Sequence, residues 1–323
     1  MIPVFYNSYA TEQVYDIIRG AMPNGFKLLT LSKDSDAERM RLASECEVAI
    51  CAAHPLSAEI IHAATRLRLV HHQGVGYHDT VDIAALRERK IALALTPEGT
   101  TTGVAEHTVL LMLAACKQLS FADSELRQGR FHINELRPVS REVSGMTIGY
   151  IGMGRIAQAV AERLRPFETR GIYYDQYTGL NTSREQALGL ERMETLEALL
   201  QTADIVTLHL PLTPLTRHLI NAGSLAKMKR GSILINTARG SLVDNNALAD
   251  ALAGRHLAAA GLDVFEQEPL PISSPLVGLP NIILTPHIAA GTRDALTTKM
   301  RALFANIERF YQGMPLRNQV ALD

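Results

Sequence analysis

The sequence contains no tryptophan, only three cysteines, and no excess of charge of either sign. Its 32 lysines and arginines are balanced by 33 aspartates and glutamates. Because no basic block stands out either, the composition does not favour a surface that binds nucleic acid. The cysteines Cys46, Cys51 and Cys116 have spacings that fit neither a zinc site nor a disulfide framework. These absences favour a reducing compartment, and we expect a cytoplasmic protein.

Long apolar runs are also missing from the sequence. The most apolar stretch, residues 109–116, is too short to span a bilayer and follows Glu106 and His107, so it predicts a core helix. Residues 1–10 have no basic region ahead of an apolar run, and we therefore expect neither a signal peptide nor a membrane association.

Short apolar segments alternate with helical patterns along most of the chain, which is typical of parallel strands covered by helices on both faces. In the first third the predicted strands are residues 48–54, 67–72 and 91–97. After a polar segment at 123–145 the predicted strands are residues 147–152, 170–175, 204–211, 231–236, 258–265 and 281–287. Since 323 residues are many for one domain, we predict two doubly wound α/β domains.

The last part of the chain predicts a single amphipathic helix, with Thr292 as its N-cap and Gly313 as its stop. The apolar residues that share one face of this helix are Leu296, Met300, Leu303, Ile307 and Phe310. A lone helix after a finished sheet is expected to return to the first domain. The polar segment 123–145 is expected to form a connecting arm that packs on a second subunit.

The segment GYIGMGRIA predicts a dinucleotide-binding loop, because it places Gly152 and Gly154 between a strand and a helix. Gly152 would permit the tight turn, and Gly154 would let backbone N–H groups approach a pyrophosphate at the helix N-terminus. Asp175 ends the next strand, where a carboxylate can accept from both ribose hydroxyls and would repel a 2′-phosphate. With no arginine beside Asp175 in the sequence, these residues predict NAD rather than NADP. A structural turn with a surface aspartate is the alternative.

Three polar residues follow late strands of the second domain. Arg239 comes after residues 231–236, Glu268 after 258–265, and His287 at the end of 281–287. Singly they could be a loop bridge, a surface turn and a helix cap, but parallel strands bring them to one edge of the sheet. The three suit hydride transfer at an alcohol carbon, C2, next to a carboxylate. Arg239 would hold that carboxylate with a forked pair of bonds and polarise the oxygen on C2. His287 would exchange the hydroxyl proton, and Glu268 would orient and favour the imidazolium.

The sequence resembles the D-isomer-specific 2-hydroxyacid dehydrogenase family, which includes glyoxylate/hydroxypyruvate reductases and 3-phosphoglycerate dehydrogenases. The resemblance covers nearly the whole chain. It rests on the segments GYIGMGRIA, HLPLT, NTARGSLVD, LDVFEQEP and PHIAAGT, with GVGY and VAEHT in the first third.

The resemblance implies an NAD-dependent oxidoreductase acting on a small D-2-hydroxy acid or 2-keto acid, with Arg239, Glu268 and His287 as its catalytic residues. It implies a Rossmann NAD-binding domain, residues 100–289, inserted in a flavodoxin-like substrate domain of residues 1–99 with a returning helix at 290–323. It also implies a homodimer built through the NAD domain, and binding of the substrate carboxylate by the backbone of Val75 and Gly76. The NAD contacts that it implies, in addition to the glycine loop, are Arg155, Ile156, Asp175, His209, Pro211, Thr237, Ala238, Asp263, Ala289 and Ala290.

Several histidines in the first third could suggest other chemistry. His71 and His72 are adjacent on a strand and point to opposite faces, so we predict no metal site there. His107 is expected to be a satisfied core or interface histidine. The turn at His54 holds no arginine or lysine, which favours an unphosphorylated substrate such as glyoxylate, hydroxypyruvate or pyruvate. The alternative substrates are 3-phosphoglycerate and an inorganic anion such as phosphite. The alternative to an enzyme is a binding protein that senses dinucleotides.

Overall fold

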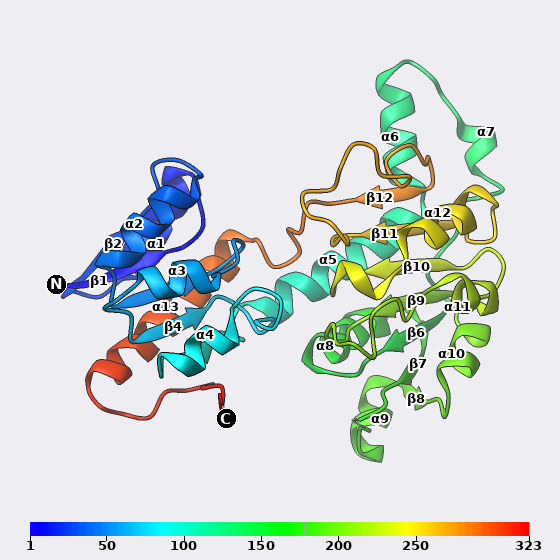
Figure 1. Ribbon diagram of the computed structural model, residues 1–323. Helices are drawn as coiled ribbons and strands as arrows, with labels where there is room; N and C mark the ends of the chain where they lie inside the picture. Colours follow the sequence, from blue (N-terminus) through cyan, green and yellow to red (C-terminus); the bar gives the residue numbers. More distant parts are fainter. Residues whose placement is uncertain (178, 323) are drawn as a thin grey trace. The chain divides into compact units, whose positions relative to one another are not determined.

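The structure is a computed structural model that describes residues 1–177 and 179–322. The chain divides into two compact units. The first consists of Met1–Thr100 together with Thr292–Asp323, and the second of Thr101–Gly291. The chain therefore leaves the first unit once, builds the second, and returns with its last helix (Figure 1).

The first unit is built on a parallel sheet of order β2-β1-β3-β4-β5. Its strands are β1 (Ile2–Tyr6), β2 (Phe26–Leu29), β3 (Val48–Cys51), β4 (Leu69–His72) and β5 (Ala92–Leu95). This is the flavodoxin-like strand order. The last three strands lie within predicted segments, whereas β1 and β2 were not predicted. Pro3 interrupts the apolar run of β1 and Lys27 that of β2, so neither has the pattern of a fully buried strand.

Helix α13 (Arg293–Tyr311) completes the core of the first unit, together with α1 (Glu12–Ala21). The hydroxyl of Thr292 accepts a hydrogen bond from Ala295 N at 3.0 Å, as expected of an N-cap. Gly313 follows the end of the helix with φ of 68°. Met300, Leu303, Phe304 and Ile307 are buried against the sheet, which accounts for the predicted apolar face. The remaining helices of the unit are α2 (Asp36–Glu45), α3 (Ala58–Ala63) and α4 (Ile83–Glu88).

The second unit is built on a longer parallel sheet of order β12-β11-β10-β9-β6-β7-β8. Its strands are β6 (Thr147–Ile151), β7 (Arg170–Tyr174), β8 (Leu190–Arg192), β9 (Ile205–Leu208), β10 (Ile233–Asn236), β11 (Ala259–Leu262) and β12 (Ile282–Leu284). All except β8 lie in predicted segments. Strand β8 escaped prediction because it has three residues, of which Glu191 and Arg192 are exposed at the sheet edge. The order is that of a Rossmann fold with one added edge strand, which confirms the predicted fold class.

Both faces of this second sheet are covered, which explains why its strands read as continuous apolar runs. Ile233 and Ile235 of β10 belong to one buried cluster, while Leu234 between them belongs to the other. The helices are α5 (Thr100–Cys116), α6 (Leu119–Arg127), α7 (Ile133–Leu136), α8 (Arg155–Leu164), α9 (Thr182–Leu188), α10 (Leu196–Thr202), α11 (Ala222–Lys227) and α12 (Asn245–Ala253). In the part of the chain that the structure describes, none of the helices is both long and apolar enough for a membrane span.

The strand order of the second unit reverses at β6, which lies between β7 and β9. In open parallel sheets of this kind, ligands bind beyond the carboxyl ends of the strands at such a switch point. The residues that follow β6, β7, β9, β10, β11 and β12 therefore form the edge on which a functional site is expected.

Candidate active site

The loop after β6 has the shape that a dinucleotide phosphate requires. Gly152 has φ of 89°, and a Cβ there would lie 2.6 Å from the carbonyl oxygen of His209, so no other residue fits without a shift. Gly154 is the N-cap of α8, and a Cβ there would meet no atom within 4 Å. Arg155 and Ile156 begin the helix. The open space at Gly154 and the backbone N–H groups of this helix N-terminus fit a pyrophosphate.

Asp175 directly follows β7, beside this loop. Its Oδ2 accepts from Met153 N at 2.8 Å and its Oδ1 from Tyr177 N at 2.9 Å, so the carboxylate is fixed next to the glycine turn. Arg192 of β8 donates from Nη2 to the carbonyl oxygen of Asp175 at 3.1 Å. Sequence reasoning missed this arginine because it comes from a strand 17 residues further on. The guanidinium is held at the backbone of Asp175.

Arg239 stands in a turn that two neighbours determine. Asn236 binds both sides of the turn, because its Nδ2 donates to Arg239 O at 2.9 Å and its Oδ1 accepts from Ala238 N at 3.0 Å. Gly240 packs against the backbone of Phe265, and a Cβ there would lie 1.9 Å from the carbonyl carbon. The loop after β10 and the loop after β11 are therefore in backbone contact. This contact holds Arg239 near the loop that carries Glu268.

Glu268 and His287 form a direct pair. Glu268 Oε2 lies 2.7 Å from His287 Nδ1, and Glu268 Oε1 accepts from Phe265 N at 2.9 Å. The hydrogen bond to Glu268 is the main cause that raises the pKa of His287, against burial and the charge of Arg239, which lower it. Burial would raise the pKa of Glu268, but the bonds from His287 and Phe265 outweigh it and lower that pKa. Arg239, Glu268 and His287 therefore form one electrostatic group.

Asp263, which follows β11, anchors the turn that carries His287. Its carboxylate accepts from Ile288 N at 2.9 Å and from Ala289 N at 2.8 Å, and its carbonyl oxygen accepts from His287 N at 2.8 Å. Ala290 follows in the same segment. These bonds account for the placement of the segment 287–290 after β12.

The other predicted cofactor residues lie at the same edge of the sheet. His209 follows β9, its Nε2 lies 3.0 Å from Thr207 Oγ1, and burial lowers its pKa to about 3, so its ring is neutral. Pro211 comes two residues later. The hydroxyl of Thr237, after β10, lies 2.9 Å from that of Thr108, and Ala238 is next to it in the turn of Arg239.

Val75 and Gly76 belong to the first unit, in the loop after β4. Val75 is exposed, and Gly76 O accepts from the hydroxyl of Thr80 at 3.2 Å. The two histidines of β4 have different partners: Thr96 and Asn306 for His71, Thr80 and Gly74 for His72. Among the described residues, no group of three or more His, Cys, Asp or Glu side chains could hold a metal ion.

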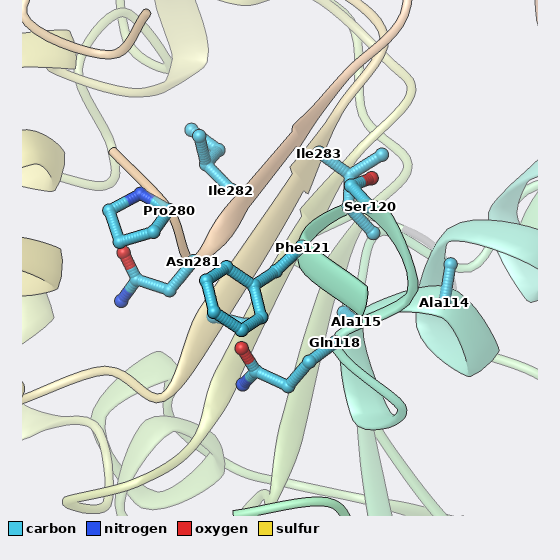
Figure 2. Close-up of a pocket in the computed structure, with 10 residues that line it drawn as sticks. Ala114, Ala115, Gln118, Ser120, Phe121, Pro280, Asn281, Ile282 and Ile283 are labelled. Carbon is cyan, nitrogen blue, oxygen red and sulfur yellow. The ribbon is translucent and has the colours of Figure 1, made fainter. Parts of the chain in front are cut away.

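A pocket in the second unit lies away from these residues, beside the edge strand β12 and the start of α6 (Figure 2). Phe121 and Gln118 point toward Pro280 and Asn281 across it. None of its lining residues is a predicted site residue. The pocket therefore belongs to the edge at which the arm of α6 and α7 begins.

Comparison with known proteins identifies the family. The sequence model described as D-isomer specific 2-hydroxyacid dehydrogenase, NAD binding domain, matches residues 109–289. The chain is 39% identical over 261 residues to glyoxylate reductase of Korarchaeum cryptofilum, covering 80% of this chain and 77% of that protein. The chain belongs to the D-isomer specific 2-hydroxyacid dehydrogenase family. The predicted resemblance and the prediction of NAD binding are confirmed.

Two further relatives extend the comparison. D-3-phosphoglycerate dehydrogenase of Archaeoglobus fulgidus is 34% identical over 313 residues, which are 97% of this chain but 58% of that protein. The chain thus spans little more than half the length of this relative. The crystal structure of the TT0316 protein of Thermus thermophilus superposes with a TM-score of 0.87 at 34% identity, over 99% of this chain and 100% of that one.

The position of Asp175 predicts the cofactor preference. We expect NADH to be preferred over NADPH by at least about tenfold in kcat/KM, because the carboxylate repels a 2′-phosphate. Replacement of Asp175 by alanine should narrow this ratio, whereas the neighbouring exposed control Gln176→Ala should leave it near the wild-type value. The ratio is measured by titrating each cofactor at saturating keto acid. Equal use of both cofactors by the wild type would refute the assignment.

Proposed function

We propose that the protein is an NAD-dependent oxidoreductase that interconverts a small D-2-hydroxy acid and its 2-keto acid. The observation that carries the proposal is the 2.7 Å contact between Glu268 and His287 beside Arg239, at the ligand edge of an NAD-binding sheet. A bound nicotinamide supplies or accepts the hydride at C2. We propose that Gly152, Gly154, Arg155, Ile156 and Asp175 hold the adenosine and phosphate end. For the nicotinamide end we propose His209, Pro211, Thr237, Ala238, Asp263, Ala289 and Ala290.

His287 serves as acid and base in this proposal. Because Nδ1 is hydrogen-bonded to Glu268, Nε2 is the ring atom that would exchange a proton with the substrate. In the reduction it donates a proton to the oxygen at C2, and in the oxidation it removes that proton. The raised pKa of His287 favours the imidazolium, which is the form that keto-acid reduction needs.

Arg239 binds the carboxylate of the substrate in this proposal. A guanidinium offers a planar fork that matches a carboxylate and also reaches the neighbouring oxygen at C2. Its charge stabilises the negative charge that develops on this oxygen during hydride transfer. The backbone of Val75 and Gly76 is proposed as a further contact of the substrate.

The end of β3 in the first unit favours an unphosphorylated substrate. Burial and then the charge of Arg39 lower the pKa of His54, which favours a neutral ring there. Arg39 was not foreseen beside His54, because it comes from α2. Its guanidinium, however, is already bound by the carboxylates of Asp34 and Asp36. This cluster offers no surplus positive charge to a phosphate, so glyoxylate, hydroxypyruvate or pyruvate fits better.

A substrate panel tests the activity. NADH oxidation is followed with glyoxylate, hydroxypyruvate and pyruvate, and NAD reduction with 3-phosphoglycerate and phosphite. We expect turnover of the unphosphorylated keto acids. A second test replaces Arg239 by lysine. Because Arg239→Lys keeps the charge but loses the planar fork, it should lower kcat/KM by the equivalent of about 2–4 kcal/mol. Turnover of 3-phosphoglycerate or phosphite alone would replace the substrate assignment, and tight NADH binding without any turnover would favour a sensor.

The pair of Glu268 and His287 makes a prediction about pH. For keto-acid reduction, kcat/KM should fall as pH rises through the pKa of free-enzyme His287. Glu268→Gln removes the charge that raises this pKa, so the falling limb should move to lower pH and activity at neutral pH should drop. The matched control is Glu266→Gln, because Glu266 bonds His218 at 2.9 Å instead. An unmoved limb in Glu268→Gln would mean that another group orients His287.

We also propose a homodimer built through the NAD-binding unit. The arm after α5 exposes large apolar side chains, which are Leu119, Leu126, Phe131, Ile133 and Val139. They gather on α6, α7 and the adjoining loop, which project beyond β12, next to the pocket of Figure 2. A monomer seldom exposes so many large apolar residues on one segment, so a second copy of this arm is the proposed partner.

The buried free thiols of all three cysteines suit a reducing cytoplasm, which cell fractionation would test.

Sedimentation measures the predicted dimer. Phe131 is 74% exposed, and Phe131→Asp should shift the protein toward the monomer because it places a charge in the apolar contact. The control Leu215→Asp changes a residue of the same unit that is 76% exposed outside the arm, and it should leave the dimer intact. A wild-type protein that sediments as a monomer at micromolar concentration would reject the proposal.

A further inference from the structure

The turn that carries His287 is held in a conformation that the residue would not adopt by preference. His287 has φ of 53°, in the left-handed region that side chains other than glycine seldom occupy. Three successive N–H groups, of His287, Ile288 and Ala289, all donate to Asp263. Asp263 is fully buried. The carboxylate of Asp263 binds Ile288 N and Ala289 N, and its carbonyl oxygen binds His287 N. The placement of the turn that carries His287 therefore depends on this one buried residue.

Two further side chains fix that carboxylate. The hydroxyl of Thr285 lies 2.6 Å from Asp263 Oδ1, and His107 Nε2 lies 2.9 Å from the same hydroxyl. A carboxylate only accepts, so the hydroxyl hydrogen of Thr285 is donated to Asp263. The hydroxyl oxygen is then the acceptor for His107, which must carry its hydrogen on Nε2. The resulting chain runs from His107 through Thr285 to Asp263.

This series of hydrogen bonds links separate elements of the fold. His107 belongs to α5, Asp263 follows β11 and Thr285 follows β12. The side chain of His107 is only 11% exposed and its Nε2 is also 3.5 Å from Asp263 Oδ1. A hydrogen-bond donor in this buried place stabilises the negative charge of Asp263 as well as its orientation.

We propose that His107 and Thr285 are positioning residues of the reaction, which act on His287 through Asp263. The proposal rests on the proposed role of His287. Without the Thr285 hydroxyl, the carboxylate loses one of its side-chain donors and the turn 285–289 is no longer fixed. His287 then meets Glu268 less often in the productive geometry. The alternative is that His107 is a core histidine that matters for stability alone.

The charged groups that act on His287 are Glu268 and Asp263, which raise its pKa, and Arg239, which lowers it. Glu268 comes first among these causes through its direct hydrogen bond. A loosened turn weakens that bond, so the pKa of His287 should fall toward its ordinary value. The pH profile therefore separates positioning from stability, because a loss of folded enzyme lowers activity without moving a limb.

Two pairs of variants test the proposal. Thr285→Val removes the hydroxyl but keeps the shape, while Thr285→Ser restores it. His107→Leu removes the donor, while His107→Gln places an amide N–H near the position of Nε2. We expect Thr285→Val and His107→Leu to lower kcat about tenfold, the scale of one hydrogen bond to a charged group. They should also move the falling limb of kcat/KM to lower pH. Thr285→Ser and His107→Gln should recover most of the kcat and the limb.

The outcomes are read on folded protein, with thermal unfolding measured in parallel. If Thr285→Val and His107→Leu lower Tm but leave the limb and kcat per folded molecule at wild-type values, the positioning role is overturned. His287→Ala separates this result from a failure of the proposed function. Turnover that survives in His287→Ala rejects His287 as the acid/base. Its loss, together with an unmoved limb in Thr285→Val, rejects the role of His107 and Thr285 alone.

Discussion

Neighbouring strands of the second sheet run parallel, and this constraint decides where its chemistry can be. Carboxyl ends of parallel strands meet at one edge, so segments far apart in sequence deliver their first loop residues to one place. Asp175, Arg239, Asp263 and His287 each follow a different strand within a few residues. The same edge collects the backbone N–H groups of the glycine loop. The glycine loop and the pair of Glu268 and His287 therefore lie at one edge of one sheet.

That edge must satisfy polar groups that lie close to an apolar core. Asn236 and Asp263 are both almost fully buried, and each uses its side chain to bind the backbone of a loop at this edge. Buried amides and carboxylates of this kind lower stability unless their hydrogen bonds are made, so their presence fixes one loop conformation. Gly240 contributes by having no side chain, because a Cβ there would meet backbone atoms of Phe265. Turn geometry is thus determined by a few polar bonds and one close approach.

The sequence predicted most of this edge because its signals are local. Apolar runs located the buried strands, and the residues just after each run were the candidates for the site. What it missed came from contacts between distant segments. Strand β8 has no apolar run, Arg192 reaches Asp175 from that strand, and Arg39 reaches His54 from a helix. The partners of His107 lie 178 and 156 positions further along the chain, and a single helix pattern cannot indicate them.

The electrostatic group at the site contains an internal opposition that its proposed substrate would relieve. Glu268 raises the pKa of His287, whereas the charge of Arg239 lowers it. A substrate carboxylate bound at Arg239 offsets that positive charge, and the imidazolium then becomes easier to form. By linkage, a protonated His287 and a bound carboxylate favour each other, because the anion offsets the charge of Arg239 and because the imidazolium attracts the anion directly. The carboxylate held by Arg239 would thus favour the proton on His287 that the reduction consumes.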